Sequence, residues 1–146
     1  MPTVVTHAAV PIALDLGVGR GVISRRLLLA GVVAAVLPDP DVVAFPLGIP
    51  YADQLGHRAA THSLLFAAVV AVVGAACARA LHTTFGRALW FLFLATVSHG
   101  GLDAFTNGGV GIAFLWPWSA ERHFAPFQII EVSPIGLGRF RSERGV

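Results

Sequence analysis

The longest uncharged stretch of the chain runs from Ala59 to Ala78, twenty residues without an Asp, Glu, Lys or Arg. As a single helix, at about 1.5 Å per residue, it would reach about 30 Å, which is the thickness of the hydrocarbon core of a bilayer. Charged residues make up only 12% of the chain, whereas an ordinary soluble domain carries about 25% and needs them to cover its surface. The sequence therefore predicts an integral membrane protein and excludes a normal soluble enzyme.

Other apolar segments complete the predicted fold. Each is short for a membrane span, so we expect helix ends, and any chemistry they carry, to lie below the headgroup plane. The fold class is predicted to be all-α, an integral membrane bundle of about four short transmembrane helices plus a C-terminal interfacial or re-entrant helix. We expect one domain over residues 1–146. Besides Ala59–Ala78, the predicted segments are Val4–Val18, Leu27–Leu37 (extendable to Ile23), Ala88–Leu102 and, for the C-terminal helix, Phe124–Leu137.

The arginines predict an orientation. All ten basic residues are Arg, and they are scattered without a basic stripe, so we expect no nucleic-acid partner. Alternating passes place eight of them on one side, which the positive-inside rule assigns to the cytoplasm. We therefore expect a multi-pass protein of the inner membrane, with Arg58 and Arg122 on the opposite, non-cytoplasmic side. The eight are Arg20, Arg25, Arg26, Arg79, Arg87, Arg139, Arg141 and Arg144.

Imidazole and carboxylate groups from four separate stretches converge on that opposite side. An ionisable group at membrane depth costs about 2.5–3.5 kcal/mol on insertion scales. A bound divalent cation is the most direct way to neutralise such a concentration, so the sequence predicts a metal site. The candidate ligands are His7, Asp39, Asp41, His57, His62, His99 and Asp103.

The spacing of the carboxylates supports coordination. His99 and Asp103 are four residues apart and share one face of a helix. Prolines flank Asp39 and Asp41, and because proline fixes φ and interrupts helices we expect both carboxylates on a stiff loop. Taken alone, this Asp-Pro-Asp segment is equally consistent with a simple turn after a helix.

The segment Ala59–Ala78 is expected to contribute a metal ligand from its first turns. His57 and His62 are five residues apart, so they cannot point the same way on one helix. We therefore expect His57 just ahead of the helix, with Thr61 and His62 inside its first turns.

Taken together, these motifs resemble a family of small bacterial and archaeal inner-membrane proteins described as LexA-regulated or membrane-bound metal-dependent hydrolases. The resemblance covers residues 6 to about 124 and implies a membrane location and a hydrolase activity of poorly defined substrate. The matching motifs are Thr6-His7, Leu37-Pro38-Asp39-Pro40-Asp41, His57-Arg58, Thr61-His62-Ser63, His99 with Leu102-Asp103-Ala104, Thr106-Asn107-Gly108-Gly109 and Trp116-Pro117-Trp118-Ser119.

The donor set indicates the metal and the reaction. Ligands that are all His and Asp suit Zn²⁺, with Mn²⁺ and Fe²⁺ as alternatives. Seven candidates exceed what one tetrahedral ion uses, so we expect two ions that activate water for hydrolysis. We expect Asp41, Arg58 and Asp103 to act in catalysis, with Arg58, Thr61, Thr106 and Asn107 binding the substrate.

The predicted function is a membrane-embedded metal-dependent hydrolase. A site recessed in the bilayer points to an amphiphilic substrate, and Arg58 favours a phosphate-bearing lipid because its guanidinium binds paired oxygens. The alternative is a non-enzymatic, metal-stabilised membrane scaffold or interaction protein. The sequence leaves the oligomeric state open.

Overall fold

The computed structural model describes residues 4–131, and this part of the chain is all-helical. It contains no β-strand, only the isolated bridges Thr106–Ile130 and Ile112–His123. The predicted all-α class is confirmed for these residues. The α-helices are α1 (Val4–Val18), α2 (Arg25–Val36), α3 (Leu64–Ala76) and α4 (Phe85–Ala104), and the short 3₁₀ helices are η1 (Asp39–Ala44) and η2 (Ala60–His62).

Hydroxyl side chains set where three of the helices begin. Ser24, Ser63 and Thr84 have extended backbones, and each side-chain oxygen accepts a hydrogen bond from the backbone amide three residues later in the chain. Such N-caps satisfy backbone donors that the helix itself leaves unpaired. The cap at Ser63 also corrects the prediction of one continuous helix over Ala59–Ala78, because the chain changes direction there and Thr61 and His62 lie in η2.

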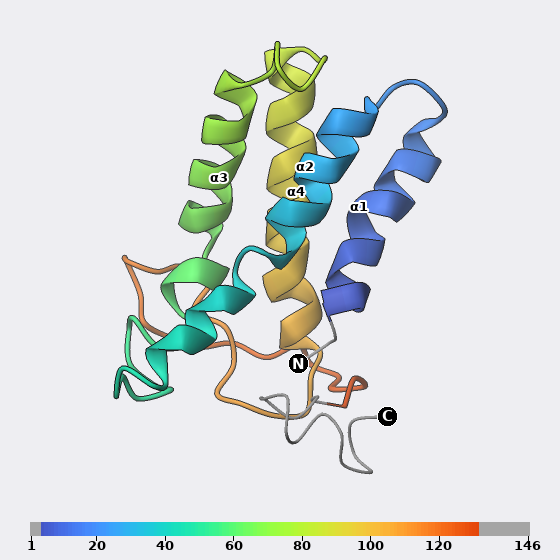
Figure 1. The fold of residues 1–146 in the computed structure, drawn as a ribbon. Coiled ribbons are helices and arrows are strands. Elements are labelled where there is room, and N and C mark those ends of the chain that lie inside the picture. Colours follow the sequence, from blue (N-terminus) through green and yellow to red (C-terminus); the bar gives the residue numbers. More distant parts are fainter. Residues whose placement is uncertain (1–3, 132–146) are drawn as a thin grey trace.

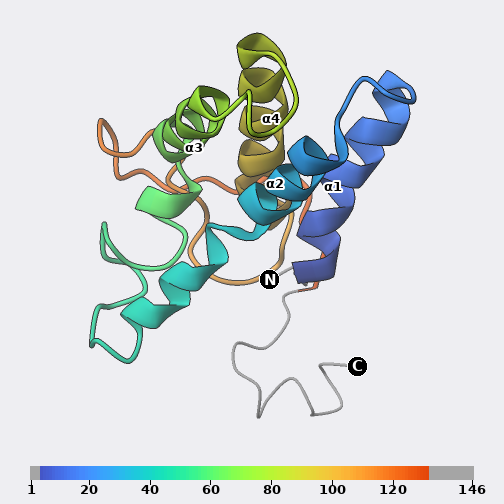
Figure 2. The same cartoon turned by 45° about the horizontal axis from the view of Figure 1, so that its top comes forward.

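Helix α4 is the central element. It packs against α1, α2 and α3, and α1 also packs against α2. Figures 1 and 2 show α3 and α1 on opposite sides of the α2–α4 pair. The interior of the bundle is therefore formed by the contacts of α4 with the other three helices.

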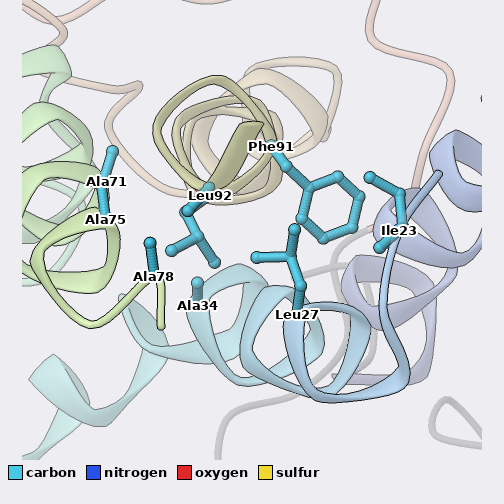
Figure 3. Packing of buried hydrophobic residues seen from close by; sticks show 9 residues of the cluster. Ile23, Leu27, Ala34, Ala71, Ala75, Ala78, Phe91 and Leu92 are labelled. Carbon is cyan, nitrogen blue, oxygen red and sulfur yellow. The ribbon is translucent and has the colours of Figure 1, made fainter. Parts of the chain in front are cut away.

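Small side chains allow this close packing. In Figure 3, Leu92 points between α2 and α3, while Phe91 points towards Ile23 and Leu27. The α2 and α3 surfaces facing them are largely alanine and glycine: a Cβ at Gly31 would lie 2.4 Å from Phe91 Cε1, and one at Gly74 would lie 2.2 Å from Leu92 Cδ1. Large side chains of α4 therefore pack directly against the backbones of α2 and α3 at these glycines.

The two ends of the bundle differ in character. The α1–α2 and α3–α4 turns lie at one end (top of Figure 1), where Arg26 Nη1 donates to Ala80 O at 3.1 Å. The arginines within residues 4–131 that were expected on one side lie at or next to these turns; Arg139, Arg141 and Arg144 lie outside the described residues. The other end carries η1, η2 and the C-terminus of α4.

The membrane-spanning prediction is supported in part. Within residues 4–131, one helical stretch, Arg25–Ala44, is long and apolar enough to cross a membrane by length and composition. Val5–Val18 and Leu64–Ala76 are apolar but shorter. A bundle of four transmembrane helices is therefore not confirmed.

Two local predictions are wrong. The Asp-Pro-Asp segment is a 3₁₀ helix rather than a stiff loop. The helix tolerates Pro40 because this residue lies in the first turn of η1, where a backbone amide would have no hydrogen-bond partner within the helix. The part of Phe124–Leu137 that the structure describes, residues 124–131, contains no helix, and the remainder lies outside the described residues. Pro126 interrupts it, and Ala125 and Ile130 instead donate their amides to Ala104 O and Phe105 O.

Substituting Gly31 tests the packing of α2 on α4. We expect Gly31→Ala to lower the free energy of unfolding by about 1–3 kcal/mol, the usual cost of overpacking a core, because the added Cβ would lie 2.4 Å from Cε1 of the fully buried Phe91 ring, which would have to shift. Thermal unfolding of the detergent-solubilised protein measures the effect. Gly86→Ala in α4 is the matched control, since a Cβ there meets nothing within 4 Å. A Gly31→Ala protein as stable as Gly86→Ala would contradict the packing described here.

Candidate metal centre

All seven predicted ligands lie at one end of the bundle. His7 lies near the start of α1, and His99 and Asp103 lie near the end of α4. The 3₁₀ helices supply the rest, apart from His57, which precedes η2. The side chains of His7, His57, His99 and Asp103 are completely buried. The predicted convergence of distant segments is therefore what the structure shows.

His99 has a defined orientation. Its Nδ1 lies 2.7 Å from the carbonyl oxygen of Ala35, so this nitrogen carries the proton and donates to α2. Its Nε2 lies 3.3 Å from Asp39 Oδ1 and 4.0 Å from Asp103 Oδ2. In the neutral ring this nitrogen is a lone pair, which carboxylate oxygens repel unless a proton or a metal ion lies between them, and an imidazole whose other nitrogen donates to a backbone carbonyl is the usual arrangement of a metal ligand.

His7 lies against His99. The two rings stack with centroids 3.7 Å apart, and His7 Nε2 lies 3.6 Å from Asp103 Oδ1. The third ring, His62, meets His99 edge to face at 4.7 Å. Its Nε2 lies 3.6 Å from Asp103 Oδ2. Three imidazoles thus surround the Asp103 carboxylate.

The inward atoms of this group lack hydrogen-bond partners. In the part of the chain that the structure describes, no partner exists for His7 Nε2, Asp39 Oδ1, His62 Nε2, His99 Nε2 or either oxygen of Asp103. Buried polar atoms are normally paired, and leaving one unpaired costs about 1–3 kcal/mol. These atoms belong to five side chains that face one another, so the group is suited to hold one positive ion.

Asp41 has a different environment. Its Oδ1 pairs with His57 Nδ1, and its Oδ2 accepts from Thr61 Oγ1 at 2.5 Å and from the Arg58 amide at 3.3 Å. Both oxygens are therefore used within the protein, unlike those of Asp103. Asp41, His57 and His62 still form a possible ligand group by proximity, since three of their donor atoms lie within 4.8 Å of one another.

The charge of the cluster favours cations. Burial lowers the pKa of His62, but contacts with the carboxylates of Asp103 and Asp41, together with their negative charge, outweigh it and raise the pKa above its ordinary value. The carboxylates thus stabilise positive charge beside them.

Arg58 is buried beside the cluster. Its Nη1 donates to Gly108 O at 2.7 Å, and its Nε lies 3.1 Å from Asp103 Oδ2, in ion-pair contact but not aligned for a hydrogen bond. Its Nη2 is buried and has no hydrogen-bond partner within residues 4–131. The guanidinium is therefore held in place with one donor to spare.

The other predicted substrate-binding residues are placed differently. Thr61 Oγ1 contacts Asp41 and His62 Nδ1, the latter at 3.0 Å. Thr106 is buried and donates to Asp103 O at 2.7 Å, so its hydroxyl supports the end of α4. Asn107 is exposed, and its backbone amide donates to Ile130 O at 3.0 Å. Of the four residues, Arg58 alone brings a donor without a described partner to the cluster.

Sequence reasoning missed two residues beside Arg58. Tyr51 is half-buried, with its ring edge-on to His57 at 5.3 Å. Gly109 has a positive φ of 87°, and a Cβ there would lie 2.6 Å from the Tyr51 hydroxyl and 2.8 Å from Arg58 Nη1. The Gly108-Gly109 pair was the available signal, because paired glycines often mark a close approach of backbone and side chain.

Arg122 was missed as well. Its guanidinium donates to the carbonyls of Tyr51, Asp53 and His57 at 3.3, 2.9 and 3.1 Å. It therefore fixes the loop that leads into His57 and Arg58. Nothing in the sequence links residues so far apart, so only the structure could reveal this contact.

With this geometry in place, comparison with known proteins identifies the family. The YdjM inner membrane protein family matches residues 1–145, and the chain belongs to it. The chain is 47% identical over 146 residues to the inner membrane protein YbcI of Escherichia coli strain K12, covering 99% of this chain and 84% of that protein. No solved structure shows significant similarity to the chain.

These names confirm one part of the expected resemblance. They support an inner-membrane location, as the sequence predicted. Neither name mentions an activity or regulation by LexA, so the comparisons carry no information on either. The metal, the reaction and the substrate must be argued from the site itself.

Removing the Arg122 guanidinium tests its role in holding the site loop. We expect Arg122→Met to lower the free energy of unfolding by about 1–3 kcal/mol, since three carbonyls lose a charged donor. The substitution should also make residues 51–57 more accessible to a protease. Limited proteolysis, with the fragments identified by mass spectrometry, measures this. Arg79→Met, at an exposed residue of the other end, is the control and should leave cleavage unchanged. Equal cleavage in both variants would contradict the role.

Proposed function

We propose that this protein is a membrane-embedded, metal-dependent hydrolase that acts on a phosphate-bearing lipid. The observation that carries the proposal is the group of inward-facing nitrogen and oxygen atoms without described partners at one end of an apolar bundle. Such an arrangement is costly unless a cation binds there. The alternative scaffold role uses the same cation without catalysis.

Five side chains would hold the ion, from two ligand groups that share His99: His7, His99 and Asp103 in one, and Asp39, His62 and His99 in the other. Three imidazoles and two carboxylates without sulfur favour Zn²⁺, with Mn²⁺ and Fe²⁺ as alternatives. A bound divalent ion supplies a nucleophilic water near neutral pH and balances the charge of a phosphoester. The Ala35 carbonyl keeps the His99 Nε2 lone pair directed at that ion.

Arg58 would bind the anionic part of the substrate. Its Nη1 and Nε are anchored by Gly108 and Asp103, which leaves Nη2 to donate to an oxygen of the substrate. Charge-assisted hydrogen bonds from Arg suit phosphate oxygens. Burial of the guanidinium strengthens the attraction because water screens it less.

The surroundings of the site favour a lipid substrate. Around the bundle, Leu16, Leu29 and Val73 are 76%, 66% and 63% exposed, and at the site end Leu47 and Trp118 are 71% and 77% exposed. Exposed apolar side chains on this scale are suited to contact with lipid. We propose a multi-pass orientation with the arginine-bearing turns in the cytoplasm and the site near the non-cytoplasmic face.

Metal content and hydrolysis should be lost together when the centre is disrupted. We expect the detergent-purified protein to contain a transition metal, measured by inductively coupled plasma mass spectrometry, and His99→Ala and Asp103→Ala to lose it along with phosphoester cleavage in lipid extracts. Extraction with a chelator should also lower the melting temperature, since the ligands come from four elements.

His82→Asn is the matched control for these variants. His82 is exposed at the other end of the bundle and has a φ of 53°, a conformation that asparagine tolerates. It should keep both metal and activity. Full hydrolysis in His99→Ala would refute the proposal, and a metal-bound wild type that cleaves no lipid class would favour the scaffold role.

The phosphate preference depends on Arg58. We expect Arg58→Lys to lower turnover of a phosphate-bearing lipid by about 10- to 100-fold, because a compact ammonium cannot reproduce the planar guanidinium that contacts Gly108 and Asp103 on one side and directs Nη2 to the substrate on the other. Its metal content should remain. Assays of phosphate release from phosphatidic acid measure the effect, and turnover equal to that of the wild type would contradict a role in phosphate recognition.

A further inference from the structure

We propose that Asp41 is not a metal ligand but a positioning residue, which works with Thr61 to orient two imidazoles, and that the centre therefore holds one ion rather than two. The inference rests on the metal site of the proposed function. It differs from the sequence-based expectation, in which Asp41 was both a ligand and a catalytic group.

The hydrogen bonds of Asp41 set it apart from the other carboxylates. Its Oδ1 receives His57 Nδ1, and its Oδ2 receives the Thr61 hydroxyl and the Arg58 amide. By contrast, Asp39 Oδ1 and both oxygens of Asp103 have no hydrogen-bond partner in the described residues. A carboxylate that already accepts three donors has little capacity left for a cation.

The hydrogen bonds of this group fix a proton on one particular nitrogen of His62. The Thr61 hydroxyl donates to Asp41 Oδ2, so it can only accept from His62 Nδ1, which lies 3.0 Å away. His62 therefore carries a proton on Nδ1, so Nε2, which lies 3.6 Å from Asp103 Oδ2, is the nitrogen that a metal ion can take in the neutral ring. Asp41 Oδ2 also lies 3.3 Å from His62 Nδ1, so Asp41 and Thr61 together fix which nitrogen can bind the ion.

The same design recurs at His99. There the Ala35 carbonyl holds Nδ1 and leaves Nε2 free for the centre. The Thr61 hydroxyl oxygen accepts from Nδ1 of His62, just as the Ala35 carbonyl oxygen accepts from Nδ1 of His99. Oxygen partners that fix the tautomer of a ligating histidine are a standard feature around metal sites, and their loss costs about 10- to 100-fold in metal affinity.

A second ion in the Asp41, His57 and His62 group would remove these contacts. It would take donor atoms from the same set, whose mutual distances are below 4.8 Å. The protons on His57 Nδ1, His62 Nδ1 and Thr61 Oγ1 fill that space instead. The two remaining ligand groups, His7–His99–Asp103 and Asp39–His62–His99, share His99, so the geometry points to a single ion between α1, α4, η1 and η2.

Cobalt binding tests the assignment without relying on activity. The full-length protein in detergent is stripped of metal and titrated with Co²⁺ against a chelator of known affinity, with the visible absorption spectrum as readout. We expect one Co²⁺ per chain in the wild type. Asp41→Asn and Thr61→Val should each weaken binding by about 10- to 100-fold and still bind one ion, whereas Thr61→Ser should keep wild-type affinity because it keeps the hydroxyl.

Asp39→Asn is the comparison variant. It removes a ligand and should abolish saturation at Co²⁺ concentrations that fill Asp41→Asn. Binding of two Co²⁺ ions by the wild type, or equal losses in Asp41→Asn and Asp39→Asn, would overturn the inference. Equal affinities of Thr61→Val and Thr61→Ser would also overturn it, because a purely structural role does not depend on the hydroxyl.

The outcome also separates this inference from the proposed reaction. One Co²⁺ per chain with the expected order of affinities, but no cleavage of any lipid, would support the positioning role and refute the hydrolase. Two ions together with hydrolysis would do the reverse. Absence of any metal binding would overturn both.

Discussion

The constraint on which the rest of the structure depends is a group of buried polar atoms that lie close together and have no hydrogen-bond partner within residues 4–131. Three imidazole nitrogens and three carboxylate oxygens face one another where α1, α4, η1 and η2 meet. Burial removes the water that would otherwise satisfy them, so a cation is the simplest compensation. The rest of the fold brings these atoms together and buries them away from water.

The apolar bundle supplies that support. Gly31 and Gly74 let Phe91 and Leu92 seat directly on the backbones of α2 and α3, so the helices approach α4 closely. Small residues at helix contacts are also how membrane helices associate, because lipid provides no hydrophobic drive between them. Close packing along α4 then fixes where its C-terminal turns meet the segments that follow α2 and precede α3.

The surroundings of the cluster complete its electrostatics. Arg58 is fully buried, pairs with Asp103 and is held by the backbone of Gly108, while Arg122 fastens the loop that carries Arg58. Within residues 4–131, the exposed arginines lie at the opposite end, at or next to the two helix-connecting turns. This distribution of the arginines accords with the inner-membrane family to which the chain belongs.

The sequence by itself determined the all-helical class, the inner-membrane location and the meeting of the His and Asp side chains, because hydropathy and helix periodicity are local properties. It even placed His99 and Asp103 on one face, from their spacing of four. Only the tertiary structure decided what each group does. Asp39 and Asp41 are two residues apart and look alike in sequence, yet Asp41 is saturated by His57, Thr61 and a backbone amide while Asp39 faces His99. Hydrogen-bond partners that come from distant segments, such as Ala35 for His99, leave no trace in local patterns.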